Sequence, residues 1–446
     1  MKLSPLAMIP HKSRKYRAIL DLSFALMVAG HELPSVNDAT KRQAPEEAMD
    51  QIGSVLPRII EAVANAPLTG DIMMSKLDIS DGFWRMVCEE GEEWNFAYVL
   101  PNKPGEDVEI VVPSALQMGW VLSPPFFCAA SETARDVAVT YAAEPVGAMP
   151  QHPLEELTMP PKEDELFWLP EGNSMNGKGS GSFLHLLEVY VDDFIQLAQT
   201  KNEDTLRHLS RSLLHAIHSV FPPPSVTGHI GADPVSVKKL LQGEGAWQVR
   251  KEILGWMFDG GTRCIELTEK RQEALLDELK KVVRVTNGVP FKRLEKLVRK
   301  LRHAAIGVPA GKGLFGPINR LMAMKPAKVF WDRCPEAKEA LQDWRQLLRE
   351  CAKEPTNTKE LVHGELDFTG TVDASGEGAG GVWLPGETKL KPTVWRVEWP
   401  QEVRNRLVTD KNRDGDITNS DLEMLGALLG WLVLEAITST KHAHVG

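Results

Sequence analysis

The stretch HLLEVYVDDFIQLAQ, residues 185–199, constrains the fold more than any other part of the chain. Two adjacent aspartates, Asp192 and Asp193, stand between two apolar runs. The runs have the length and composition of strands, so the stretch predicts a β-hairpin over 184–198 with the aspartates at its turn. Neighbouring carboxylates repel, and burying them is costly unless something positive meets them. The alternative is an ordinary turn, in which aspartate is common.

A second acidic segment, MSKLDISDGFWRM (74–86), favours a carboxylate site over an ordinary turn. Asp78 follows a short apolar strand, and Asp81 and Phe83 come directly after it. Two strands that each end in an aspartate can lie side by side in one sheet and bring their carboxylates together. Each pair of carboxylates 4 Å apart then costs about 4 kcal/mol at an effective dielectric constant of ~20. Two Mg²⁺ ions would offset this repulsion, as in the two-metal sites of phosphoryl transfer.

The composition is that of an ordinary globular protein. The chain has 446 residues, of which 43% are hydrophobic and 25% are charged, and this length suggests about three domains. Its five cysteines form no CxxC pair, which argues against a zinc ribbon or a disulfide framework. The sequence has neither a signal peptide nor an apolar run long enough for a bilayer. We therefore expect an intracellular protein of the cytoplasm or nucleus that is not secreted.

The positive charges are concentrated in two places. A net charge of −10 argues against a simple nucleic-acid coat, yet residues 1–20 and 280–302 are strongly basic. Such islands on an acidic chain suit local contacts with phosphate groups, although a solvated helix face is the alternative for 280–302. The basic residues of the two islands are Lys2, Lys12, Arg14, Lys15 and Arg17, and Lys280, Lys281, Arg284, Lys292, Arg293, Lys296, Arg299, Lys300 and Arg302.

Apolar periodicity and breaker residues predict the remaining elements. Leu294, Leu297, Val298 and Leu301 recur with the period of an amphipathic helix. Residues 72–100 suggest strand, turn and strand, 143–182 suggest a surface insertion or disordered loop, and 353–360 suggest a polar linker. The predicted helices are 46–66, 126–142, 203–219, 291–304, 335–353 and 421–437.

Five motifs resemble reverse transcriptases, and they occur in the order found in that family. The Tyr-Val-Asp-Asp run, preceded by LDISDGFW, resembles the palm of these polymerases. LQMGWVLSPPFF (116–127) resembles their Gly-Trp…Ser-Pro segment. KYRAILDLSF (15–24) resembles a fingers strand, and EILGWMF (252–258) resembles the primer-grip hairpin. The resemblance covers residues 1 to about 330 and is closest to the polymerases of retrotransposons and other retroelements.

The resemblance implies an α+β fold, in which a polymerase right hand of fingers, palm and helical thumb precedes an α/β ribonuclease H-like domain. It places partial fingers and palm in 1–250, with the disordered insertion at about 143–182. The primer grip, thumb and connection would occupy 251–352, and a truncated ribonuclease H-like domain would occupy 361–446.

The resemblance also assigns the catalytic roles. Asp78, Asp192 and the backbone of Ile79 would hold two Mg²⁺ or Mn²⁺ ions, with Asp193 in support. Tyr190 would lie near the primer end, and the basic helix 291–302 would track template–primer phosphates as the thumb.

The nucleotide pocket follows from the same resemblance. Arg17 and Lys12 would contact the triphosphate, although the choice between Lys12 and Arg14 stays open. Phe83 would exclude a 2′-hydroxyl, unless it is a core aromatic. Asp81, Gln117 and Gly119 would shape the pocket, with Gly119 allowing close backbone approach. The sequence departs from the family at Met118, where glutamine is common.

The C-terminal segments TVDASGEGAGGVWL and ITNSDLEMLGALLGWLVLE resemble the first two acidic segments of ribonuclease H. Asp373 and Glu423 would be metal ligands there. Two alternatives remain: Ser420 and Glu423 fit a helix capping box, and residues 410–421 fit an EF-hand calcium loop in part. The family's later acids are missing, so we expect a truncated domain without independent ribonuclease H activity.

Together these features predict an RNA-directed DNA polymerase, a nucleotidyltransferase fragment of a retroelement polyprotein. Its partners would be an RNA or DNA template with its primer and deoxynucleoside triphosphates, with no membrane. An inactive remnant that only binds nucleic acid is the main alternative, and a calcium-binding protein using 410–421 is the remote one.

Overall fold

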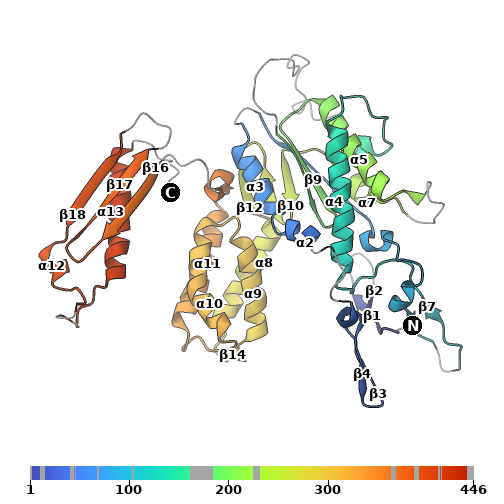
Figure 1. Cartoon of the computed structure of the whole chain (residues 1–446), viewed down its shortest axis with the longest axis horizontal. Helices are drawn as coiled ribbons and strands as arrows, with labels where there is room; N and C mark the ends of the chain where they lie inside the picture. The colour runs from blue at the N-terminus through green and yellow to red at the C-terminus, as the bar shows by residue number, and fades with distance from the viewer. Residues whose placement is uncertain are drawn as a thin grey trace. The chain divides into compact units, whose positions relative to one another are not determined.

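The computed structural model of the chain forms two compact units, residues 1–361 and 362–446, and each is described by itself. Helices and strands occur in both units (Figure 1), which confirms the predicted mixture of the two. The structure describes the whole chain except residues 1–2, 11–15, 41–44, 46, 68–69, 103–104, 161–183, 225–231, 363–367, 386–390, 410–411, 413 and 439–446.

The first unit is built around a three-stranded antiparallel sheet of order β5-β9-β8. The strands are β5 (Met73–Asp78), β8 (His185–Tyr190) and β9 (Asp193–Ala198). Leu77, Val189 and Phe194 are partners in register and are buried on one face of the sheet. Because strand residues alternate between faces, Asp78 and Asp193 lie on the opposite face. The predicted hairpin over 184–198 is confirmed.

Helices α4 (Ser123–Ala142) and α5 (Glu203–Val220) contribute most of the helical residues to the core under this sheet, and α3 (Val55–Asn65) contacts β8. Figure 1 shows α4 and α5 lying side by side, in agreement with their extensive contacts. Helix α5 begins where the Asn202 side chain accepts a hydrogen bond from Thr205 N, a standard N-cap. Helix α4 starts at Ser123, with prolines in its first turn, earlier than the predicted 126.

Two sequence-based predictions were wrong in the first hundred residues of this unit. The helix expected over 46–66 is divided at Gly53-Ser54 into α2 (Glu47–Ile52) and α3. The second strand expected before residue 100 is a 3₁₀ turn, η2 (Glu93–Phe96), followed by the short β6 (Tyr98–Val99), which pairs with β7 (Ile110–Val111). Another 3₁₀ turn, η1 (Gly82–Arg85), follows β5.

The segment predicted as a loose insertion over 143–182 is ordered in its first part. Its 3₁₀ turn η3 (Glu155–Thr158) is tied to α5, because the Arg211 guanidinium binds the buried Glu155 carboxylate at 2.7 and 2.8 Å. Thr158 Oγ1 also donates to Ser210 Oγ at 2.8 Å. Residues 161–183 lie outside the described part, so the remainder of that prediction is not tested.

Small hairpins make up the N-terminal region. Strands β1 (Leu6–Pro10) and β2 (Tyr16–Leu20) pair antiparallel, as do β3 (Leu26–Val28) and β4 (His31–Leu33). The short helix α1 (Val36–Ala39) follows, capped by the Ser35 side chain, which accepts from Asp38 N. Leu20, Leu22, Val36 and Phe96 form a small buried cluster that fixes this region.

A second sheet adjoins β5 through hydrogen bonds between Met74 and Gln248. Its first two strands form the hairpin expected around EILGWMF, with a turn at Leu254 and Gly255, both of positive φ. Its strands are β10 (Arg250–Ile253), β11 (Trp256–Asp259), β12 (Cys264–Leu267) and β15 (Thr356–Asn357). Strand β15 and the turn η5 (Thr358–Leu361) replace part of the expected linker, and both Thr356 and Thr358 are buried.

The rest of the first unit is helical, and its helices pack as a bundle (Figure 1). The apolar positions predicted for residues 291–304 are all buried, which confirms that amphipathic helix. The short helix α7 (Val237–Leu241) contacts η3 and lies outside this bundle (Figure 1). The elements of the bundle are α8 (Glu269–Val283), α9 (Phe291–Ala304), η4 (Pro309–Leu314), α10 (Phe315–Ala323) and α11 (Pro335–Cys351), with the strand pair β13 (Val289–Pro290) and β14 (Lys328–Val329).

The second unit is an antiparallel sheet of order β16-β17-β18 with a helix on one face. Gly426 and Gly430 of the helix lie directly against Val372 of the sheet, where a Cβ atom would be 3.0–3.2 Å from its methyl groups. The elements are β16 (Phe368–Ala374), β17 (Gly378–Pro385), β18 (Thr393–Glu398), α12 (Gln401–Arg404) and α13 (Asn419–Ile437). Among the described residues of both units, no helix has the length and apolar character to cross a bilayer.

Candidate functional site

Three aspartates meet at the end of the first sheet, as the sequence predicted. Asp78 is the last residue of β5, and its partner in register is Asp193, the first residue of β9. Asp192 lies in the two-residue turn before β9, and its carbonyl oxygen accepts a hydrogen bond from Ile79 N at 3.0 Å. The backbone therefore holds residues more than a hundred positions apart in one place.

The turn that carries Asp192 is strained. Val191 has a φ of 57°, a left-handed conformation that β-branched residues rarely adopt. Such a conformation costs about 1–3 kcal/mol and persists only where the surrounding structure imposes it. Here the hydrogen-bonded strands on both sides of the turn impose it.

Burial makes these carboxylates hard to ionise. It raises the pKa of Asp78 from 3.8 to about 6, with a smaller contribution from the nearby Asp193 and against the lowering effect of Lys239. Burial also raises the pKa of Asp192, helped by the charge of Asp78. The pKa of Asp193 is raised by burial too, and Lys76 opposes that shift. The site is thus a place where negative charge accumulates and needs a counter-ion.

Two lysines that sequence reasoning missed supply part of this positive charge. Lys239 Nζ lies 2.7 Å from Asp78 Oδ1, and Lys76 Nζ lies 3.7 Å from Asp193 Oδ1. Lys76 stands two residues before Asp78 on β5, so alternation along the strand could have placed it on the same face. Nothing in the sequence around Lys239 indicates its contact with Asp78.

The donor chemistry fits a hard divalent cation, because carboxylate oxygens are the ligands that Mg²⁺ and Mn²⁺ prefer. Asp78 and Asp192 are the pair that would share it, since the charge of Asp78 already raises the pKa of Asp192. Within the described residues, no group of three or more His, Cys, Asp or Glu side chains is already arranged as a metal cage. The ammonium group of Lys239 stands at one of the oxygens that a cation would need.

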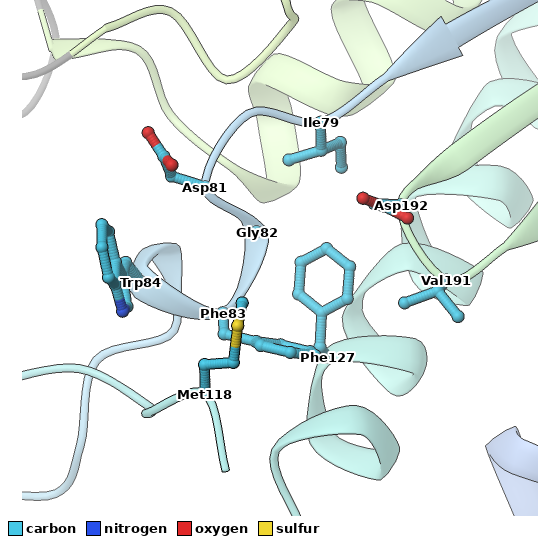
Figure 2. A pocket seen from close by; sticks show the side chains of 9 residues that line it. All are labelled: Ile79, Asp81, Gly82, Phe83, Trp84, Met118, Phe127, Val191 and Asp192. Atoms are coloured by element: carbon cyan, nitrogen blue, oxygen red, sulfur yellow. The ribbon is translucent and has the colours of Figure 1, made fainter. Parts of the chain in front are cut away.

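A pocket of about 140 Å³ opens beside Asp192. Figure 2 shows the rings of Phe83 and Phe127 below the Asp192 carboxylate, with Asp81 and Trp84 on the opposite side. The two rings meet edge to face, with centroids 5.5 Å apart. The lining residues are Ile79, Asp81, Gly82, Phe83, Trp84, Met118, Phe127, Val191 and Asp192.

Two residues predicted for this pocket lie elsewhere. Gln117 is buried and donates from Nε2 to Ala115 O at 2.8 Å, so Met118 lines the pocket in its place. Gly119 lies outside the lining, but its φ is +109° and a Cβ atom there would be 2.6 Å from Leu20 O. Gly119 therefore lets the chain pass close to the backbone of β2, and its role in shaping the nucleotide pocket stays a prediction.

Replacing Gly119 by alanine is expected to destabilise the first unit by about 2–4 kcal/mol, since the methyl group meets Leu20 O in a conformation that already disfavours it. Urea denaturation measures this loss. Gly91→Ala is the matched control, because Gly91 has a φ of +92° and open space around it. Equal losses of stability in the two variants would show that the close approach to Leu20 does not contribute to the destabilisation.

Side chains are described for only some of the residues predicted to bind phosphate. Lys12 and Arg14 lie outside the described residues, and Arg17 is described only by its backbone in β2. On α9 the basic side chains Lys292, Lys296 and Arg302 are exposed. Tyr190, expected near the primer end, is also exposed, at 38%.

The predicted acids of the second unit are not joined by any described contact. Asp373 lies between Val372 and Ala374, whose side chains face α13, so alternation turns Asp373 toward the other face of the sheet. Glu423 is exposed on α13. Their joint role in metal binding stays a prediction.

One alternative for this region, the capping box of Ser420 and Glu423, is corrected by the cap of α13, while the calcium loop stays untested. The capping box joins Thr418 to Asp421, and Ser420 and Glu423 do not form it. The Asp421 carboxylate accepts from Thr418 N and Thr418 Oγ1, both at 2.7 Å, so the last ligand of the expected EF-hand loop is committed to the helix end. Asp410 lies outside the described residues.

Comparisons with known proteins give a limited result. No protein-family model matches the chain, and no curated protein matches it. Among solved structures, a foamy viral protease-reverse transcriptase in complex with double-stranded DNA aligns over 98% of this chain and 56% of its own, with 15% identity and a TM-score of 0.47. A foamy viral protease-reverse transcriptase with an RNA/DNA hybrid aligns over 98% and 43%, with 15% identity and a TM-score of 0.44.

The chain thus spans less than two thirds of the length of these two proteins. Because the TM-scores are below 0.5, the alignments do not establish the family or the activity of the chain.

Proposed function

We propose that the chain is an RNA-directed DNA polymerase fragment that adds deoxynucleotides to a primer 3′-hydroxyl. The observation that carries the proposal is the convergence of Asp78, Asp192 and Asp193 at one end of a sheet. Asp192 lines a pocket that Phe83 also lines. The ordered motifs that resemble reverse transcriptases support it.

The reaction joins the 3′-oxygen of the primer to the α-phosphorus of a deoxynucleoside triphosphate and releases pyrophosphate. Asp78, Asp192 and the Ile79 carbonyl would hold two Mg²⁺ or Mn²⁺ ions, with Asp193 in support. When bound, the ions supply activation of the hydroxyl and neutralisation of the leaving group. The strained turn at Val191 and the hydrogen bond from Ile79 fix the backbone of Asp192, so this residue needs little backbone reorganisation on binding.

The pocket residues would orient the nucleotide. The ring of Phe83 would lie under the sugar and leave no room for a 2′-hydroxyl. Asp81 lines the opposite side of the pocket from Asp192. Arg17 and Lys12 would contact the triphosphate, because guanidinium and ammonium groups suit phosphate oxygens.

The template and its primer would lie along the exposed basic face of α9. Several of its basic side chains are exposed, while its apolar face is buried in the helical bundle. Contacts of this kind neutralise phosphates without reading sequence, which suits a polymerase that must move along its template.

A primer-extension assay tests the proposal. With poly(rA)·oligo(dT), dTTP and Mg²⁺ or Mn²⁺, the wild type is expected to extend the primer, and Asp192→Asn is expected to lower the rate at least about a hundredfold. Asp343→Asn, an exposed aspartate on α11, is the charge-matched control and is expected to retain the rate.

Two results would contradict the polymerase. One is a folded wild type that binds the duplex but extends nothing, which would favour the nucleic-acid-binding remnant. The other is equal extension by Asp192→Asn and the wild type, which would place the chemistry elsewhere.

A further inference from the structure

The contact between Lys239 and Asp78 is the shortest ion pair at the carboxylate cluster. Lys239 Nζ lies 2.7 Å from Asp78 Oδ1, while the Asp78 side chain is only 13% exposed. A cation at Asp78 and this ammonium group would compete for the same oxygen. The pair therefore bears directly on how the site accepts a metal ion.

Lys239 is aimed at Asp78 by tightly packed backbone. It belongs to α7, and Ser236 N, just before this helix, donates to Asp78 O at 2.9 Å. Leu240, the next residue, is buried so close to Gly245 that a Cβ atom on Gly245 would lie 2.3 Å from Leu240 Cδ2. The base of the lysine is thus fixed to the strand that carries Asp78, and only its side chain can move.

A second carboxylate stands within reach of the same ammonium group. Glu244 Oε2 lies 4.0 Å from Lys239 Nζ and 3.5 Å from Lys76 Nζ. Both Lys239 and Glu244 are a little more than one third exposed. A small rotation of the lysine side chain would exchange Asp78 for Glu244 while keeping the ammonium group paired.

We propose that Lys239 is a built-in counter-ion of Asp78 that a divalent cation must displace, and that Glu244 receives the ammonium group when this happens. This inference rests on the proposed function, because it takes Asp78 to be a metal ligand. It makes metal affinity depend on two side chains that do not themselves bind the metal. Without metal, the lysine neutralises part of the charge that would otherwise repel within the carboxylate cluster.

Two substitutions have opposite expected effects. Removing the competitor with Lys239→Met is expected to tighten Mn²⁺ binding roughly tenfold, since the interaction is partly screened by solvent. Removing the alternative partner with Glu244→Gln is expected to weaken Mn²⁺ binding several-fold. If the effect came from net charge alone, variants of Lys238 and of Lys239 would change Mn²⁺ binding equally.

Titration of the metal-free, full-length chain with Mn²⁺, followed by calorimetry and by the electron paramagnetic resonance signal of free Mn²⁺, measures these affinities without nucleotide or catalysis. Lys238→Met is the matched control, because Lys238 is exposed on the same helix and carries the same charge. Lys239→Gln repeats the test with a polar side chain in case the methionine variant folds poorly.

The expected result is tighter binding in both Lys239 variants than in Lys238→Met. Affinities equal to that control, or weaker, would overturn the role of Lys239. Asp78→Asn separates this outcome from a failure of the proposed function: if it leaves Mn²⁺ binding unchanged, the metal site itself is wrong. If it abolishes binding while the Lys239 variants match Lys238→Met, only the counter-ion inference fails.

Discussion

An Asp78→Asn variant is expected to lose primer extension by about a thousandfold or more and yet to be more stable than the wild type near neutral pH. Burial raises the pKa of Asp78 from 3.8 to about 6. The folded chain therefore holds this proton more tightly than the unfolded chain. This contribution to stability is complete below about pH 4 and is lost as the pH rises through about 6. Asparagine carries no charge to desolvate, so the variant avoids that loss.

The size of the gain follows from the shift in pKa. About two pKa units correspond to roughly 2–3 kcal/mol in the free energy of unfolding. Urea denaturation in the presence of a chelator, at a series of pH values from about 4 to about 8, measures the difference between variant and wild type. It should be near zero at the acidic end and should favour the variant increasingly above about pH 6.

The control for this experiment is Asp343→Asn, which changes the same charge at an exposed position. A stability difference that does not vary with pH would contradict the buried, hard-to-ionise Asp78. A variant that loses both activity and stability would indicate that Asp78 has a structural role in holding α7 through Lys239.

The elements predicted well from the sequence are those in which a local pattern and the tertiary environment agree. The Asp192-Asp193 hairpin joins two apolar strands, and Leu187, Val189 and Phe194 of these strands share one buried core. Helix α9 buries the residues that recur at helical spacing. In both cases the apolar residues that define the local pattern are the ones that the fold buries, so local preference and tertiary packing agree.

The elements predicted poorly are those that depend on distant partners. Composition alone made 143–160 resemble a loose loop, but Arg211 of α5 holds Glu155 in a buried ion pair. The helix expected over 46–66 is interrupted by Gly53-Ser54, a weak local signal inside a strong apolar pattern. In each case the decisive contact or break is nearly invisible in sequence spacing.

The same distinction holds within the candidate site. The acidic residues could be found because each lies at the end of an apolar strand, where a carboxylate near other carboxylates needs a counter-ion. Lys239 could not be found, since its contact with Asp78 depends on the packing of Leu240 against Gly245 and on the hydrogen bond from Ser236 N. Met118, which stands where the family commonly has glutamine, lines the pocket, whereas the predicted Gln117 is bonded to Ala115 O.

The second prediction of large effect concerns the choice of sugar. Phe83 lines the pocket beside Asp192, and its ring is held edge-on against Phe127. A ring held in this way has little freedom to move away from an extra hydroxyl group on the sugar. Replacing Phe83 by valine is therefore expected to lower the discrimination between dUTP and UTP, which differ only at the 2′ position, by about 10- to 200-fold, the range that a small steric group typically provides.

The measurement is the ratio of kcat/KM for dUTP to kcat/KM for UTP on an rA template, for the wild type and for Phe83→Val. Phe126→Val is the control, because Phe126 stacks on Trp120 and does not line the pocket. If Phe83 is only a core aromatic, its loss should lower stability and both kcat/KM values together and leave their ratio unchanged. A changed ratio in Phe83→Val alone requires that the ring meets the nucleotide sugar, since a general loosening of the core would affect both nucleotides alike.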